Sequence, residues 1–178
     1  LKPIDKSSGL YPEQGRGIKK NEKDPFVIET VEGGIFKALS VIISTGANWN
    51  ALGVPGEDRL RGRGVSYCAT CDGPLFKNKD IVVVGGGDTA LGDAIFLTRF
   101  ANKVTVVHRR DKLRAAKILQ ERALMNKKIE LCLKSVATEI IGDTKVAGIK
   151  VKSVSTNEEK IIKADGVFVL IGLSPNSG

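Results

Sequence analysis

The chain has 178 residues, of which 42% are hydrophobic and 27% are charged, a composition that excludes disordered, collagen-like and coiled-coil proteins. The formal net charge is +8, and six of these eight excess charges lie in residues 101–130, which hold 9 basic and 3 acidic side chains. This local excess indicates one anion site and argues against a nucleic-acid-binding surface. Apolar runs are far shorter than the ~20 residues that cross a bilayer, and three cysteines are too few for a disulfide scaffold, so we expect no membrane segment and a cytoplasmic protein.

The first part of the chain predicts short β structure. Residues 1–25 are polar and show no periodicity, so irregular backbone is expected there. Apolar patterns predict strands at residues 26–31, 35–39 and 41–45. The first two flank Gly33-Gly34 and are typical of a hairpin, whereas the third has the composition of a buried strand. Residues 47–64 contain several Gly and Pro breaks and are interpreted as a connection between domains.

From residue 80 onward the pattern is that of an α/β unit. Continuous apolar runs predict parallel strands, and apolar spacings of three and four predict helices. The strands are expected at residues 81–84, 104–107, 129–133 and 167–171, and the helices at 89–100 and 112–127. Three alternating runs predict an antiparallel meander at residues 136–141, 146–154 and 159–164. The predicted fold class is therefore α/β, a three-layer Rossmann-like domain with a parallel sheet and a β-meander.

A glycine-rich turn joins the first of these strands to its helix. Residues 85–90 fit the pattern G-x-G-x-x-A. The first Gly permits the tight turn, the second admits a pyrophosphate, and the small sixth residue lets the helix pack on the strand. A plain glycine turn is the alternative, but the strand before it and the helix after it favour a dinucleotide site with phosphate on the helix N-terminus. The candidate binding residues are Gly85, Gly86, Gly87, Asp88, Thr89 and Ala90.

Basic residues follow the next predicted strand, where an NAD site usually has a carboxylate. His108, Arg109 and Arg110 lie 23 to 25 residues after Gly85, and Arg114 follows one helical turn later. Guanidinium groups bind a 2′-phosphate through charge-assisted hydrogen bonds, so this segment favours NADPH, with a solvated basic helix face as the alternative. The single histidine, His108, is interpreted as flanking the phosphate, with a lone catalytic base as the other interpretation.

Cys68 and Cys71 form a C-x-x-C motif that is followed by Asp72. Half of a zinc site would need two more ligands, and the remaining His and Cys are distant in sequence. For two structural core cysteines the spacing would be a coincidence. In a redox pair one thiolate attacks and the other resolves, and Asp72 can hold the proton. The β-α-β pattern beside the motif favours this third interpretation.

Two smaller predictions concern the cysteines. Gly73-Pro74 directly after the pair argues against a helix that starts on it, and with it against a thioredoxin fold. Cys132 lies inside a predicted strand and is expected to be a buried structural residue.

The order and spacing of these motifs resemble the low-molecular-weight thioredoxin reductases of bacteria and archaea, class II pyridine nucleotide-disulphide oxidoreductases. The matching stretches are residues 67–73, 84–90 and 108–114. Residues 172–176 resemble the family segment that returns to the flavin domain, and residues 45–47 resemble its A-T-G crossing. The likeness covers roughly residues 26–178.

The resemblance implies that NADPH reduces a bound FAD, that the flavin reduces a Cys68–Cys71 disulfide, and that the resulting dithiol reduces thioredoxin. It also implies that Cys71 lies against the flavin, that Cys68 attacks the protein disulfide, that Asp72 acts as acid/base, and that the whole protein is a homodimer. Further contacts are implied for NADPH at Ile171 and Gly172, and for FAD at Thr45, Gly46 and Ala47.

The chain departs from the family in ways that predict a partial enzyme. No FAD G-x-G-x-x-G motif precedes residue 80, the terminal Gly-Asp segment is missing, and residue 1 is Leu. We expect residues 1–47 and 172–178 to be parts of an FAD domain that flank an NADPH/disulfide domain at residues 48–171. Such a chain should bind NADPH but carry little FAD and have little reductase activity. The open alternatives are an NADH-dependent peroxiredoxin-reductase-type flavoprotein and a non-catalytic NADP-binding redox module.

Overall fold

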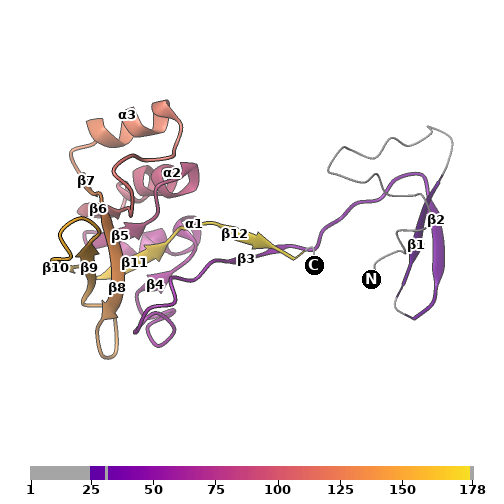
Figure 1. Ribbon diagram of the computed structural model, residues 1–178, viewed down its shortest axis with the longest axis horizontal. Helices are drawn as coiled ribbons and strands as arrows, with labels where there is room; N and C mark the ends of the chain where they lie inside the picture. Colours follow the sequence, from indigo (N-terminus) through magenta and orange to yellow (C-terminus); the bar gives the residue numbers. More distant parts are fainter. Residues whose placement is uncertain (1–24, 31, 177–178) are drawn as a thin grey trace. The chain divides into compact units, whose positions relative to one another are not determined.

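The computed structural model describes residues 25–30 and 32–176, and contacts along the chain divide it into two units, Leu1–Thr45 and Gly46–Gly178. In the first unit, β1 (Phe26–Glu29) and β2 (Ile35–Ala38) pair antiparallel (Figure 1), which confirms the predicted hairpin. Thr30 closes its turn, since its carbonyl accepts from the N–H of Gly33 and its hydroxyl from the N–H of Gly34.

The buried strand predicted at residues 41–45 does not form. These residues have no regular structure, and Ile42 and Ile43 are 92% and 81% exposed. Apolar side chains are buried only where another layer covers them, and no described residue covers these. A short strand, β3 (Ala47–Trp49), follows instead, within the predicted connection at residues 47–64.

The second unit is built around a five-stranded sheet in the order β4-β11-β5-β6-β7. All neighbouring strands in it are parallel. Their bounds are Val65–Ser66 (β4), Asp80–Val84 (β5), Lys103–Val107 (β6), Ile129–Cys132 (β7) and Gly166–Val169 (β11). The four strands predicted from continuous apolar runs are confirmed, and β4, which no pattern predicted, completes the sheet.

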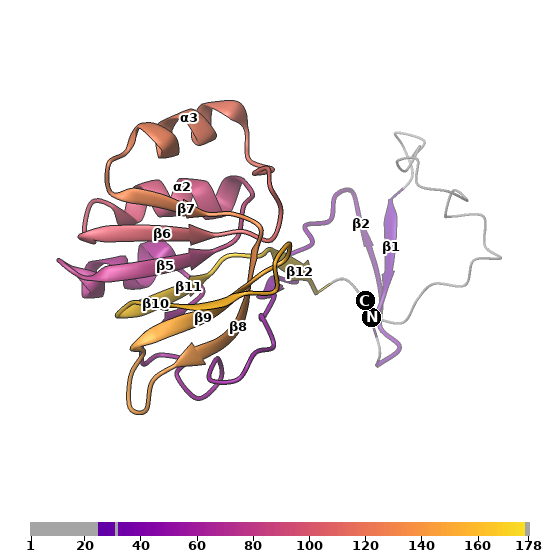
Figure 2. The same cartoon turned by 60° about the vertical axis from the view of Figure 1, so that its left-hand side comes forward.

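Helices cover one face of this sheet and the meander covers the other (Figures 1 and 2). The helices are α2 (Asp88–Leu97) and α3 (Lys117–Met125), and the meander strands are β8 (Ser135–Ile141), β9 (Gly148–Ser153) and β10 (Glu159–Lys163). A hydrophobic core lies on each face of the sheet, and alternate residues of β5 point into opposite cores. Ile81 packs on the helix side, and Val82 packs on the meander side. The three-layer α/β prediction is therefore confirmed.

The basic helix is shorter than predicted. Its first predicted turns, residues 112–116, form an irregular loop, and the helix begins only at Lys117. The backbone N–H groups of Arg114 and Ala115 donate to the carbonyl of Gly86, and that of Ala116 donates to the Asp88 carboxylate, so they are engaged outside any helix. Within the part of the chain that the structure describes, no helix is long and apolar enough to span a membrane.

Candidate functional site

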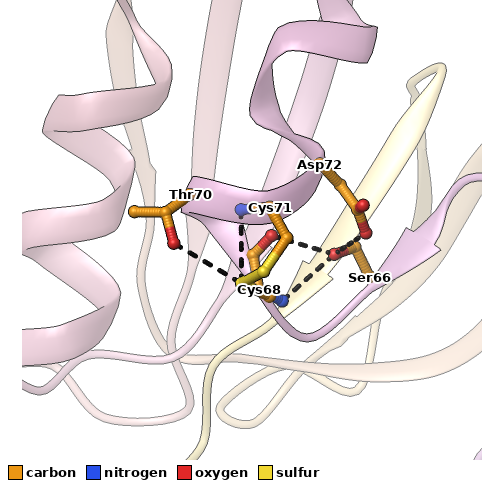
Figure 3. The surroundings of a disulfide bond; sticks show 5 residues. All are labelled: Ser66, Cys68, Thr70, Cys71 and Asp72. Carbon is orange, nitrogen blue, oxygen red and sulfur yellow. Dashed lines mark hydrogen bonds between the residues drawn. A yellow bond between two sulfur atoms is a disulfide. The ribbon is translucent and has the colours of Figure 1, made fainter.

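Cys68 and Cys71 are joined in a disulfide, with their Cα atoms 5.3 Å apart (Figure 3). Cys68 is the N-cap of α1 (Ala69–Asp72), a single helical turn that passes into the 3₁₀ turn η2 (Gly73–Phe76). The prediction that no helix starts on the pair is therefore wrong. Pro74 is tolerated because it lies in the first turn of η2, where a backbone N–H would have no partner within the helix.

Two polar groups contact the sulfur atom of Cys68. The backbone N–H of Cys71 donates to Cys68 Sγ over 3.2 Å, and the Thr70 hydroxyl lies 3.5 Å from the same atom (Figure 3). Donors at the start of a helical turn favour a thiolate over a thiol. The same donors would stabilise negative charge on this sulfur in the reduced pair.

Asp72 is connected to Cys68 through Ser66, a residue that no sequence pattern indicated. The Ser66 hydroxyl donates to Asp72 Oδ2 over 2.7 Å and accepts from the Cys68 N–H over 3.1 Å (Figure 3). Ser66 ends β4 and is only 4% exposed. A two-residue strand has no recognisable periodicity, so the fold was needed to find this side chain.

The segment before the disulfide is held by Glu57, a buried carboxylate that sequence reasoning also missed. Glu57 is 2% exposed and accepts from the N–H groups of Leu52 and Gly53 and from the Tyr67 hydroxyl, over 2.9, 2.7 and 2.8 Å. Burial, followed by the hydrogen bond to Glu57, raises the pKa of Tyr67 to about 12. The phenol therefore stays protonated at neutral pH, and its ring stacks on Trp49 with centroids 5.9 Å apart.

The glycine-rich turn joins β5 to α2 as predicted, and its three glycines have different surroundings. A Cβ atom on Gly85 would clash with the carbonyl oxygen of Leu170, and one on Gly86 would clash with the ring of His108. A Cβ atom on Gly87 would meet no atom within 4 Å. Gly87 is the second glycine of G-x-G-x-x-A, so the open space lies where a pyrophosphate would approach the start of α2.

The basic segment is attached to this turn through its backbone. The N–H of Arg114 donates to the carbonyl of Gly86 over 2.7 Å, and the N–H of Ala116 donates to Asp88 Oδ1 over 2.7 Å. Asp88, predicted to bind a cofactor, thus also anchors the loop. The exposed guanidinium groups on this stretch belong to Arg109, Arg110 and Arg114.

His108 packs beneath the turn. It is 7% exposed, its ring lies against Gly86, and its Nε2 is buried with no hydrogen-bond partner among the described residues. Burial lowers the pKa of His108, and the three neighbouring arginines lower it further, although a backbone hydrogen bond at Lys112 opposes the shift. A neutral, enclosed ring supports the turn and fits the flanking interpretation better than that of a catalytic base.

We expect acid to destabilise the second unit through His108. Its folded pKa lies below the unfolded value of about 6.5, so this contribution is complete above about pH 6.5 and is lost as the pH falls through the folded pKa. Urea denaturation at pH values below about 6.5 measures the free energy of unfolding. His108 should make this free energy fall by up to ~1.4 kcal/mol per pH unit, and His108→Gln should remove this contribution. An identical pH dependence in both proteins would contradict the assignment.

The disulfide and the glycine turn lie at the same edge of the parallel sheet. In the strand register, Ser66 of β4 and Val83 of β5 both lie opposite Phe168 of β11. The cysteines follow the carboxyl end of β4, and the turn follows the carboxyl end of β5. Ligands of open α/β sheets bind at this edge. Ile171 and Gly172 also leave the sheet here, directly after Leu170, whose carbonyl packs on Gly85.

The segments predicted to cross to a flavin domain pair with each other. Strand β3 forms an antiparallel ribbon with β12 (Leu173–Pro175), and the N–H of Asn176 donates to the carbonyl of Gly46 over 3.0 Å. Ala47 lies opposite Pro175 in this ribbon, whereas Thr45 belongs to the first unit. Cys132 is a buried free thiol, as predicted.

Residues 7–178 match the family model of the pyridine nucleotide-disulphide oxidoreductases. The thioredoxin reductase of Listeria monocytogenes is 49% identical over 166 residues, which are 92% of this chain and 52% of that protein. The thioredoxin reductase of Bacillus subtilis is 52% identical over 143 residues, 80% of this chain and 45% of that protein. The chain thus spans about half the length of the curated relatives it matches.

Solved structures show the same fold. Lactococcus lactis thioredoxin reductase in the FR conformation matches with a TM-score of 0.75 and 44% identity, over 85% of this chain and 54% of that one. The thioredoxin reductase of T. acidophilum matches with a TM-score of 0.76 and 38% identity, over 89% of this chain and 52% of that one. These similarities confirm the resemblance that the three motifs indicated.

Proposed function

Because the chain belongs to the pyridine nucleotide-disulphide oxidoreductase family, we propose that it is the NADPH-binding and disulfide-bearing part of a thioredoxin-disulfide reductase. The observation that carries the proposal is the shared sheet edge, with the Cys68–Cys71 disulfide after β4 and the glycine turn after β5. Relatives named thioredoxin reductase support thioredoxin, or a thioredoxin-like protein, as the partner.

The glycine turn at residues 85–90 and the arginine-bearing loop after β6 have the features that NADPH binding requires. Open space at Gly87 adjoins the first N–H groups of α2, where the helix dipole favours a phosphate. The exposed arginines after β6 provide the charge-assisted donors that a 2′-phosphate requires, at the place where NAD sites have a carboxylate. When bound, NADPH supplies a hydride, and FAD in the whole protein connects it to the disulfide.

The cysteines have separate roles in the reduced state. Cys68 attacks one sulfur of the thioredoxin disulfide as a thiolate stabilised by the N–H of Cys71, which forms a mixed disulfide and releases one thioredoxin thiol. Cys71 then attacks Cys68, so the internal disulfide forms again and the second thiol is released. Asp72 takes up the proton of the Cys68 thiol and returns it to the first departing thioredoxin sulfur, and the proton of the Cys71 thiol passes to the second. Two electrons and two protons thereby pass to thioredoxin.

We also propose the organisation of the whole protein. Residues 1–47 and 172–178 belong to an FAD domain, residues 48–171 form the NADPH/disulfide domain, and Thr45, Gly46 and Ala47 contact FAD. The pairing of β3 with β12 supports this division, because it brings both expected crossings together. We propose a cytoplasmic homodimer, as the resemblance implies.

Two measurements on this chain test the proposal without added flavin. The chain is reduced with dithiothreitol, desalted and mixed with oxidised thioredoxin, and thiols are counted by alkylation; one thioredoxin disulfide should be reduced per chain. Calorimetric titration should show NADPH binding at least about tenfold tighter than NADH. Tight NADPH binding without transfer to thioredoxin would indicate a non-catalytic redox module instead. A preference for NADH would indicate a peroxiredoxin-reductase-type flavoprotein.

A further inference from the structure

Ser66 occupies an unusual position between the backbone of one cysteine and the carboxylate that follows the other. Its oxygen lies 2.7 Å from Asp72 Oδ2 and 3.3 Å from the carbonyl oxygen of Cys68, and it accepts from the Cys68 N–H over 3.1 Å. A hydroxyl has one proton to donate, and the shorter contact assigns it to Asp72. The result is a directed chain from amide to hydroxyl to carboxylate, in which each bond polarises the next.

We infer that Ser66 is a positioning residue for proton transfer at the disulfide, because its hydroxyl binds the Asp72 carboxylate and links it to the backbone of Cys68. This inference rests on the proposed function, in which Asp72 takes up the proton of the attacking thiol. In that step the S–H proton passes to Asp72, the cysteine sulfur forms a bond to the disulfide under attack, and that disulfide breaks with the electron pair on the departing sulfur.

Burial and backbone hydrogen bonding hold the Ser66 hydroxyl and the Asp72 carboxylate in this arrangement. Ser66 is nearly fully buried at the end of β4, so water competes little for its hydroxyl. Asp72 is held at its backbone as well, since its N–H donates to the carbonyl of Cys68 over 3.2 Å. The bond to Ser66 engages Oδ2, and the thiol proton is assigned to the second carboxylate oxygen, Oδ1. A proton acceptor is effective only when it is held within reach of its donor.

The test uses a small disulfide, 5,5′-dithiobis(2-nitrobenzoate), so that neither NADPH nor thioredoxin is required. The reduced chain is mixed with this probe, and the release of two thionitrobenzoate ions as Cys68–Cys71 closes is followed by stopped flow; the buried Cys132 contributes a separate slow phase. Ser66→Ala should slow closure about tenfold, to the rate of Asp72→Asn. Ser66→Thr, which keeps the hydroxyl, should stay within about threefold of the wild type.

A double-mutant cycle separates positioning from general destabilisation. If Ser66 acts through Asp72, the variant that combines Ser66→Ala with Asp72→Asn closes no more slowly than Asp72→Asn alone. The matched control is Ser135→Ala, another buried serine of the same unit, which should close at the wild-type rate. A wild-type rate for Ser66→Ala, or effects that multiply in the double variant, would overturn the inference. A failure to reduce thioredoxin would instead count against the proposed function alone.

Discussion

Cys71→Ser is expected to trap thioredoxin on the chain as a stable mixed disulfide, whereas Cys68→Ser is expected to give no adduct at all. Cys68 Sγ accepts from the N–H of Cys71 and lies near the Thr70 hydroxyl, and such donors favour a thiolate, which supports the attacking role proposed for Cys68. Without Cys71, the chain has no thiol that resolves the covalent intermediate, and alkylation directly after mixing blocks the thioredoxin thiol that the attack sets free. Reduced variants mixed with oxidised thioredoxin should show the adduct by intact-protein mass and by non-reducing electrophoresis.

Both variants should lose the reduction of thioredoxin completely, since each cysteine is needed to close the disulfide. The matched control is Cys132→Ala, which removes a buried thiol outside the pair and should keep the wild-type rate. An adduct formed by Cys68→Ser and not by Cys71→Ser would reverse the two roles. Adducts with both variants would show that the hydrogen bonds on Cys68 do not select the nucleophile.

The double substitution Arg109→Ala with Arg110→Ala is expected to weaken NADPH binding at least about 100-fold and to leave NADH binding nearly unchanged. A hydrogen bond to a charged group contributes about 1.5–3 kcal/mol, and each 1.4 kcal/mol corresponds to a factor of ten in affinity. The two cofactors differ by the 2′-phosphate, so removal of its donors affects one of them. Calorimetric titration with both nucleotides measures the effect directly.

The fold should survive this change, because both arginines are exposed. Lys160→Ala combined with Lys163→Ala removes the same charge from exposed positions on β10, in the layer opposite the helices, and serves as the control. This control should bind NADPH within about twofold of the wild type, since distant exposed charges are screened by salt. Equal losses for NADPH and NADH in the arginine variant would show that the loop binds a part common to both nucleotides.

Local patterns predicted the central part of the fold because their causes are local. Residues 81–84 and 104–107 are continuous Val, Ile and Thr runs that are stable only as buried strands, and β5 and β6 form there. The turn after β5 requires a glycine at position 85, because a Cβ atom there would clash with the carbonyl oxygen of Leu170. The same reasoning failed at residues 41–45, where an apolar run indicates a buried strand only if another layer covers it.

Sequence patterns predict the α/β class, the C-x-x-C pair with Asp72, the glycine turn and the cluster of arginines, because each is encoded by residues within a few positions of one another. Their arrangement in space follows only from the folded backbone. In the folded chain the N–H of Ala116 donates to Asp88, so α3 begins later than predicted. The ring of His108 packs against Gly86, and the hydroxyl of Ser66 donates to Asp72. These contacts depend on where the backbone passes after folding. A hydrogen bond or a packed ring between separate segments has no periodic signature in the chain, so only the assembled sheet edge reveals it.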